Sequence, residues 1–215
     1  MPESRAVLEL FPPYNIEVAV RELADFSHIW VLFVFHGNKA GSGGWRPTVR
    51  PPRLGGNRRI GVFASRSPFR PNPIGLSAVA LERVETGSQA LLLHLSGIDF
   101  LDQTPVLDIK PYLPYADSIT HASGGFSTLV PQVALRVVFT DEARQFCLER
   151  ERAGYPGLQK LIIQLLAQDP RPAYHQDAGM NDRQFGMKLF DFDIRWRLQD
   201  GQIQVTTVED LSARA

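Results

Sequence analysis

The amino-acid sequence predicts a mainly β protein, with a small barrel or sandwich over residues 1–125 and a small α+β domain over residues 126–215. Two observations support the first domain: short apolar runs recur along it, and loops rich in Gly and Pro separate these runs. A third observation places the boundary, because residues 116–131 are small, polar and rich in turn formers. Beyond the boundary the apolar residues follow strand-like and helix-like periods in turn, which is typical of an α+β domain.

Five strands are expected in the first domain. The bulky run of residues 29–35 indicates a strand buried on both faces, and His36-Gly37 ends it. Another strand is expected at residues 90–95, where leucines at every second position give the strand one apolar face. The remaining strands are expected at residues 59–65, 75–84 and 106–109.

The second domain is expected to open with a strand at residues 133–139. Thr140 is a suitable N-cap for a following helix that should end near Gly154. A second helix should follow and stop at Asp169-Pro170, because proline lacks the amide that a helix interior needs. Its apolar stripe consists of Leu158, Leu161, Ile162 and Leu165.

A β-hairpin is expected to complete this domain. Apolar and charged residues alternate over residues 190–198, which predicts a half-buried strand with Phe190 in the core. Asp200-Gly201 is a typical two-residue hairpin turn, so a return strand is expected at residues 203–205.

Composition excludes several classes of protein. The single Cys excludes a disulfide framework and a multi-cysteine metal site, and the five scattered histidines show no zinc spacing, so no metal is expected. The longest apolar run is far too short to span a membrane, and the first residues lack the pattern of a signal peptide. We therefore expect a soluble, cytoplasmic protein. Neither GxGxxG nor GxxxxGK occurs, which argues against Rossmann and P-loop phosphate sites.

The charge is distributed unevenly. The whole chain is neutral, but residues 26–81 contain no acidic residue, one lysine and seven arginines, a local charge of +8 with His neutral. A charge run is commonly only a solvated face, yet a stretch of this length is suited to an anionic partner such as phosphate, carboxylate or nucleic acid. The preference for Arg over Lys favours bidentate or stacking contacts.

Long motifs carry a more specific signal. They are FSHIWVLFVFH at 26–36, GGWRPTVRPPRLGG at 43–56, GGNRRIGVFASRSPFRPNPIGLS at 55–77, GIDFLDQTPVLDIKPYLPYADS at 97–118 and DPRPAY at 169–174. Together they resemble the signature of the TsaA/TrmO family and cover most of the chain.

The resemblance implies a tRNA methyltransferase that uses S-adenosylmethionine. The implied target is N6 of threonylcarbamoyl-adenosine at position 37, next to the anticodon of a threonine tRNA. The family fold is a small β-barrel that binds the cofactor and works as a homodimer. A further family strand and loop usually precede the region that matches Leu8–Tyr14, so we expect this family segment to be missing from the chain.

The family pattern also assigns residues. Arg66 is expected to clamp the carboxylate of the cofactor, since guanidinium and carboxylate pair in a bidentate manner. No general base is named, because the carbamoyl group makes the N6 proton easier to lose. Cofactor contacts are implied for His36, Gly37, Arg66, Leu76, Ser96, Gly97, Ile98 and Asp99. Contacts with the tRNA are expected from Arg50, Arg53, Arg58, Asp169, Arg171 and Tyr174.

Other interpretations stay open at this point. His36 could be a structural residue at a strand end, Asp99 a turn residue, and Asp169 to Tyr174 a helix terminator. The protein could also be a non-catalytic RNA- or nucleotide-binding barrel that has lost cofactor competence. A related barrel that methylates another small substrate is the weaker alternative, because DPRPAY resembles the tRNA branch.

Overall fold

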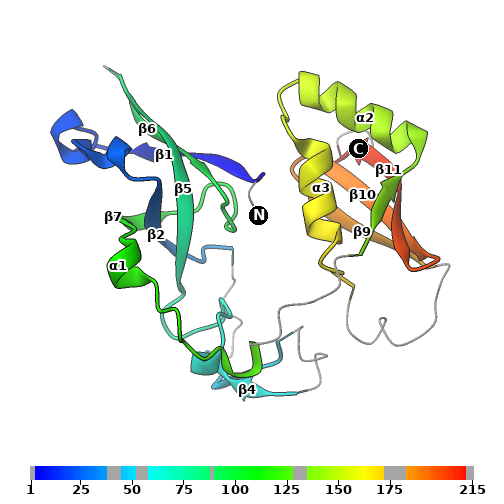
Figure 1. Ribbon diagram of the computed structural model, residues 1–215, viewed down its shortest axis with the longest axis horizontal. Helices are drawn as coiled ribbons and strands as arrows, with labels where there is room; N and C mark the ends of the chain where they lie inside the picture. The colour runs from blue at the N-terminus through cyan, green and yellow to red at the C-terminus, as the bar shows by residue number, and fades with distance from the viewer. Residues whose placement is uncertain are drawn as a thin grey trace. The chain divides into compact units, whose positions relative to one another are not determined.

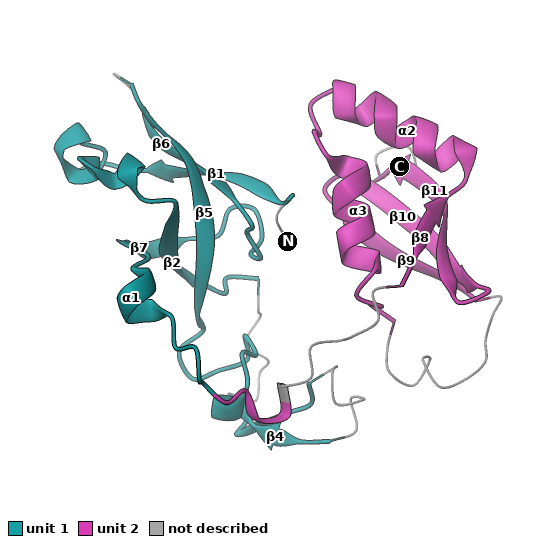
Figure 2. Cartoon of the chain, in the orientation of Figure 1, with its two compact units in different colours: residues 1–51, 57–122 teal, residues 52–56, 123–215 magenta. Residues whose placement is uncertain are grey.

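The computed structural model describes residues 3–37, 45–51, 58–87, 90–127, 135–171 and 183–211. The chain divides into two compact units (Figure 2). Unit 1 is formed by residues 1–51 and 57–122, and unit 2 chiefly by residues 123–215. None of the helices in these described ranges is long and apolar enough to cross a membrane.

Unit 1 is built around one antiparallel sheet with the strand order β1-β6-β5-β2-β7 (Figure 1). A two-stranded hairpin, β3-β4, and a short helix, α1, complete it. Within the described residues no pairing joins the edge strands β1 and β7, so the sheet is open there. The elements are β1 (Arg5–Leu10), β2 (His28–Val34), β3 (Thr48–Val49), β4 (Ile60–Gly61), β5 (Ile74–Thr86), β6 (Leu91–Ser96), β7 (Val106–Pro111) and α1 (Pro114–Asp117), with 3-10 turns at Glu17–Val20, Leu23–Asp25 and Val62–Ala64.

One face of this sheet forms the core of unit 1. Ile29, Val31 and Phe33 of β2 are at most 2% exposed, and they pack with the leucines of β6. The alternate residues of β2 on the other face are only half-buried. The expectation that this strand is buried on both faces was therefore wrong, because an antiparallel sheet can leave one face partly open to water.

Two local predictions in unit 1 differ from the structure. Residues 59–65 are not one strand: Ile60–Gly61 pairs with β3, and Val62–Ala64 then forms a 3-10 turn. The Ser65 hydroxyl and amide both donate to the carbonyl of Val62, at 2.8 and 3.2 Å, so this side chain closes the turn and ends the strand. Strand β1 was not predicted; it pairs with β6 along its whole length.

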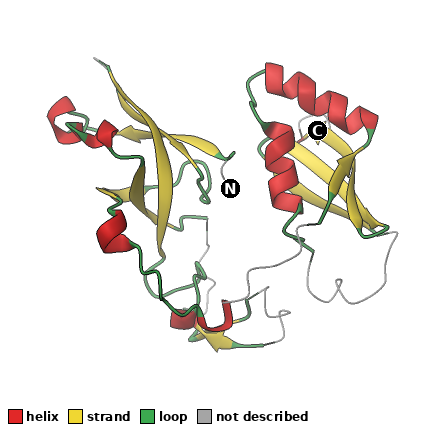
Figure 3. Ribbon diagram, viewed as in Figure 1, coloured by secondary structure: helices red, strands yellow, loops and turns green. Residues whose placement is uncertain are grey.

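Unit 2 places two helices against one face of a four-stranded sheet (Figure 3). The strand order is β8-β11-β10-β9, with β8 parallel to β11 and the other pairs antiparallel. Buried Cys147, Leu158 and Ile162 of the helices pack against Ile194 and Ile203 of the sheet. The elements are β8 (Val137–Phe139), α2 (Asp141–Arg152), α3 (Leu158–Leu166), β9 (Gln184–Leu189), β10 (Phe192–Gln199) and β11 (Gln202–Asp210), and a 3-10 turn lies at Gly125–Ser127.

Most local predictions for unit 2 are confirmed. The Thr140 hydroxyl accepts a hydrogen bond from the amide of Ala143 at 3.3 Å, as an N-cap does. Asp200 and Gly201 have φ angles of 51° and 73°, which a two-residue hairpin turn requires. The placement of Phe190 in the core was wrong: it has a φ of 52°, is 52% exposed, and lies in the turn between β9 and β10.

Candidate functional site

The end of β2 meets the loop of residues 97–104 that follows β6. The Thr104 hydroxyl lies 3.3 Å from Nδ1 of His36, and the amide of His36 donates to the carbonyl of Val34 at 2.8 Å. A Cβ placed on Gly37 would lie 3.1 Å from Cδ1 of Leu101, so this loop approaches the backbone of Gly37 closely. Both residues at this strand end are exposed to solvent.

The start of the same loop is fixed to Ser4, which precedes β1, and to β5. Gly97, with a φ of 80°, donates its amide hydrogen to the carbonyl of Ser4 at 2.9 Å. The Ser4 hydroxyl in turn donates to the carbonyl of Ile98 at 2.6 Å. Further along, the Ser77 hydroxyl of β5 donates to the Asp99 carboxylate at 2.5 Å. The segment thus has a defined backbone path and a carboxylate held in one orientation.

An aromatic contact seats the loop on the core face of the sheet. The ring of Phe100 lies 4.6 Å from that of Phe33, and Phe33 also packs on Phe35 at 5.2 Å. Loop 97–104 therefore contacts both the end of β2, beside His36, and the first part of β5, at Ser77.

Two of the expected cofactor residues point elsewhere. Leu76 is 54% exposed and pairs with Leu32 on the face of the sheet opposite to Phe33. Ser96 is 7% exposed and its hydroxyl donates to the carboxylate of Glu82. The Ser96 side chain is thus already engaged within unit 1, and its backbone lies in β6 between β1 and β5, opposite Arg5 and Ala80.

Arg66 lies on an ordered loop before β5. The guanidinium of Arg70 donates to the carbonyls of Ser65 and Ser67, at 2.9 and 3.3 Å, and so fixes the backbone on either side of Arg66. Arg66 itself is exposed, and no hydrogen bond or ion pair engages it within the described ranges. The loop returns to β2 through Pro73, whose carbonyl accepts from the amide of Phe35 at 2.8 Å.

The arginines expected to bind RNA lie on the hairpin β3-β4. Arg50 directly follows β3, Arg58 precedes β4, and both are exposed. In the part of the chain that the structure describes, neither side chain forms an ion pair, and residues 26–81 offer them no acidic partner nearby in the sequence. Arg53 lies outside the described residues. These cations are therefore available to an external anion.

The DPRPAY segment begins with a tight ion pair in unit 2. Asp169 has a φ of 50°, and its two carboxylate oxygens accept from Nε and Nη2 of Arg171 at 2.6 and 2.8 Å. The hydrogen bond to Asp169 raises the pKa of Arg171, whose side chain is only 8% exposed. The Asp169 carboxylate, in the segment that follows α3, is therefore already bound to Arg171 of the same chain. Tyr174 lies outside the described residues.

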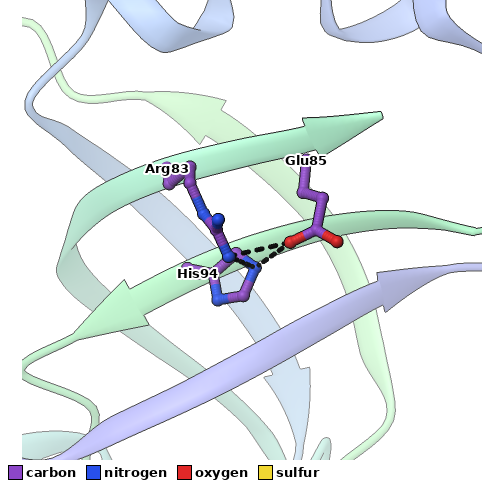
Figure 4. Close-up of polar contacts among 3 residues, drawn as sticks. All are labelled: Arg83, Glu85 and His94. Carbon is purple, nitrogen blue, oxygen red and sulfur yellow. Dashed lines mark hydrogen bonds and ion pairs between the residues drawn. The ribbon is translucent and has the colours of Figure 1, made fainter. Parts of the chain in front are cut away.

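Two further sets of charged side chains in unit 1 pair with one another on the surface. Arg83, Glu85 and His94 form one cluster across β5 and β6, with Glu85 Oε2 at 2.8 Å from Arg83 Nη2 and 2.9 Å from His94 Nε2 (Figure 4). Lys110 bonds Asp108 at 2.8 Å and thereby lowers the pKa of this carboxyl, but both side chains are at least half exposed. An exposed pair of this kind contributes little to stability.

Sequence reasoning missed the groups that orient the candidate site. Ser77, Thr104 and Ser4 each hold a predicted residue or its neighbour through a hydroxyl. Serine and threonine in loops are too common to stand out in a single sequence. Ser77 and Thr104 had a local signal, because they lie within the motifs of residues 55–77 and 97–118, whereas Ser4 lies in neither.

Comparisons with known proteins agree with this two-unit arrangement. Residues 1–118 match the family described as the tRNA-methyltransferase O N-terminal domain, and residues 132–211 match the TrmO C-terminal domain. A tRNA (adenine(37)-N6)-methyltransferase of Escherichia coli is 48% identical over 94% of this chain and 84% of its own length. A putative S-adenosylmethionine-dependent methyltransferase of Pseudomonas aeruginosa is 46% identical over 91% of this chain and 80% of its own. The crystal structure of TrmO from Pseudomonas aeruginosa has a TM-score of 0.77 and 38% identity, and the match covers 97% of this chain and 84% of that one.

Proposed function

This chain belongs to the TrmO family, and from that premise we propose that it methylates N6 of adenosine 37 in tRNA with S-adenosylmethionine as the methyl donor. The observation that carries the proposal is the match of both family domains to the two halves of the chain. We propose threonylcarbamoyl-adenosine in a threonine tRNA as the substrate. A tRNA-modifying enzyme of this kind would act in the cytoplasm.

The cofactor is proposed to bind around loop 97–104 and the end of β2. The residues fit its chemistry: Arg66 has a free guanidinium for the amino-acid carboxylate, and Asp99 offers a carboxylate to hydroxyl or cationic groups. Open space lies in front of Gly97, where a Cβ would meet no atom within 4 Å. His36 and Gly37 supply exposed backbone at the strand end, where an adenine edge could be recognised. The backbone of Ile98 completes the proposed set at this loop. Ser96 and Leu76 are supported by the family pattern alone, because Ser96 is paired on both sides within the sheet and Leu76 lies on the opposite face of the sheet.

In this mechanism the protein supplies alignment. The cofactor, when bound, provides an electrophilic methyl carbon on a sulfonium. Arg66, Asp99 and the backbone of loop 97–104 would hold the cofactor, which would supply its methyl group to N6 and leave as the neutral thioether. The N6 proton would pass to water, because the carbamoyl group stabilises the resulting charge. Ser77 holds Asp99 in place before any ligand arrives, and Thr104 does the same for His36, so the orientation needed for in-line transfer is set in advance.

The tRNA is proposed to bind the Arg-rich hairpin and the DPRPAY segment. Exposed Arg50 and Arg58 support phosphate binding, and Arg53 and Tyr174 are proposed partners on the family pattern. The Asp169–Arg171 pair supports a positioning role in which Asp169 orients the guanidinium. Adenosine 37 must leave the anticodon-loop stack to reach the methyl group.

The homodimer and the barrel are part of the same proposal. The outer face of the unit 1 sheet supports the dimer, because Ile74 and Leu76 are 46% and 54% exposed beside half-buried Leu32 and Val34. A second copy that covered this apolar face would remove it from water. Five antiparallel strands around one apolar face support the barrel.

Calorimetric titration of S-adenosylmethionine is the first test. Wild-type protein should bind it, Arg66→Ala should bind at least tenfold more weakly, and Arg59→Ala, an exposed arginine of the same stretch, should bind normally. Mass spectrometry of a threonine tRNA with and without the threonylcarbamoyl group then reads out methylation. RNA binding without cofactor binding or methyl transfer would instead support the non-catalytic alternative.

A further inference from the structure

Two large aromatic side chains lie exposed beside the hairpin β3-β4. Trp45 is 53% exposed and Phe63 is 74% exposed, yet their ring centroids are 6.3 Å apart with an interplanar angle of 40°. Neither ring belongs to the buried core of unit 1. The pair therefore forms a small apolar surface that folding of the described residues does not bury.

The backbone commits Phe63 to this exposed position. Val62, its neighbour, is 1% exposed, and its amide donates to the carbonyl of Pro47 at 2.9 Å. Ser65 closes the 3-10 turn on the carbonyl of Val62 at 2.8 Å. The turn therefore buries Val62 and leaves the ring of Phe63 exposed, with hydrogen bonds at Val62 and Ser65 holding the backbone on either side of it.

The surroundings of the two rings are cationic. Exposed Arg46, Arg50, Arg58 and Arg59 flank them in sequence, and no ion pair neutralises these four side chains within the described ranges. A second copy of the chain would bring an equal positive charge to a symmetric contact, which opposes self-association there. The combination of bare aromatic faces with free guanidinium groups instead fits single-stranded nucleic acid, whose bases stack and whose phosphates pair with arginine.

We propose that Trp45 and Phe63 form a stacking platform for unpaired bases of the anticodon loop, with Arg46, Arg50 and Arg58 binding the neighbouring phosphates. This inference rests on the proposed function and specifies how the substrate is held. When adenosine 37 leaves its stack, the bases beside it lose a stacking partner. The aromatic rings replace that partner and stabilise the opened loop.

The test measures binding of an anticodon stem-loop RNA that carries 2-aminopurine in the loop. Stacking on the rings of the wild-type protein should quench the 2-aminopurine fluorescence. Trp45→Ala and Phe63→Ala should each weaken binding about 5- to 100-fold and remove this quenching, while Phe63→Tyr should bind nearly as wild type does. The slope of log K against log salt should stay unchanged in these variants. Arg58→Gln should lower that slope by about 0.7, because one phosphate contact is lost.

Tyr115→Ala is the matched control, since this aromatic side chain of α1 is 87% exposed and lies outside the acid-free stretch. Unchanged RNA affinity in Phe63→Ala and Trp45→Ala, or dissociation of an oligomer by either variant in sedimentation, would overturn the platform. Methylation of tRNA by the wild type, measured in parallel, separates the two proposals. If the wild type methylates tRNA while both alanine variants bind RNA normally, only the platform fails; if the wild type neither binds nor methylates tRNA, both proposals fail.

Discussion

Gly75 is the position where one added methyl group should do most damage to unit 1. It lies in β5 directly opposite Phe33 of β2. A Cβ at residue 75 would lie 2.3 Å from Cζ and 2.4 Å from Cε2 of the Phe33 ring. Carbon atoms pack at about 3.5–4.0 Å, so the ring or the strand would have to move by more than 1 Å.

The ring of Phe33 has little room to move. It is 2% exposed and is flanked by Phe100 at 4.6 Å and by Phe35 at 5.2 Å. Overpacking of a well-filled core costs about 1–3 kcal/mol. We expect Gly75→Ala to fall at the upper end of this range, which lowers the melting temperature by about 10 °C for a domain of this size.

Thermal unfolding monitored by tryptophan fluorescence checks this expectation. Gly61→Ala is the matched control, because a Cβ there meets no atom within 4 Å and its φ is −58°; its melting temperature should be unchanged or slightly higher. The double variant Gly75→Ala/Phe33→Leu should recover at least about 1 kcal/mol relative to additivity, since a smaller side chain relieves the clash. A melting temperature for Gly75→Ala within about 2 °C of wild type, or strictly additive effects, would refute the reasoning.

Three further outcomes are expected. Thr140→Ala should destabilise unit 2 by about 1 kcal/mol in urea unfolding, whereas Thr140→Ser, which keeps the N-cap oxygen, should not. Burial raises the pKa of the Cys147 thiol to about 11, so thiol reagents at pH 8 should modify it only after unfolding. Between pH 9 and about 11 the thiol of the unfolded chain loses its proton while that of the folded protein keeps it, so the contribution of this group to stability is complete below pH 9 and is lost over this range. Lys110→Ala should raise the pKa of Asp108 towards its ordinary value in an NMR titration while changing stability by less than about 0.5 kcal/mol. A thiol that reacts rapidly in the native protein, or an unchanged Asp108 titration, would contradict these assignments.

Several elements of unit 2 could be predicted from the sequence because their signals are local. Thr140 before two acidic residues predicts a helix start, and Asp200-Gly201 predicts a hairpin turn, because each signal acts within a few residues. The error at Phe190 has the same origin. The alternation of apolar and charged residues includes Phe190. This residue nevertheless lies in the two-residue turn between β9 and β10, and so in neither strand.

Unit 1 was harder to predict because its contacts join distant segments. β1 depends on pairing with β6, and a six-residue run carries little signal by itself. At residues 59–65, alternation could not distinguish a strand from the turn that Ser65 closes. The orienting bonds of Ser77 to Asp99 and of Thr104 to His36 required the fold.

The parallel pairing of β8 with β11 has a consequence for how the protein is made. β11 contributes the central partner of both β8 and β10, so the sheet of unit 2 cannot be completed until residue 210 has left the ribosome. Every element of unit 1, in contrast, has been synthesised by residue 117. At about 5–20 residues per second, roughly 5 to 20 s separate these two points. In the later part of that interval, once residue 166 has been synthesised, α2 and α3 expose their apolar faces to chaperones and to other nascent chains until β11 is complete. Stalled translation before β11 should therefore be a greater hazard to this protein than stalling within unit 1.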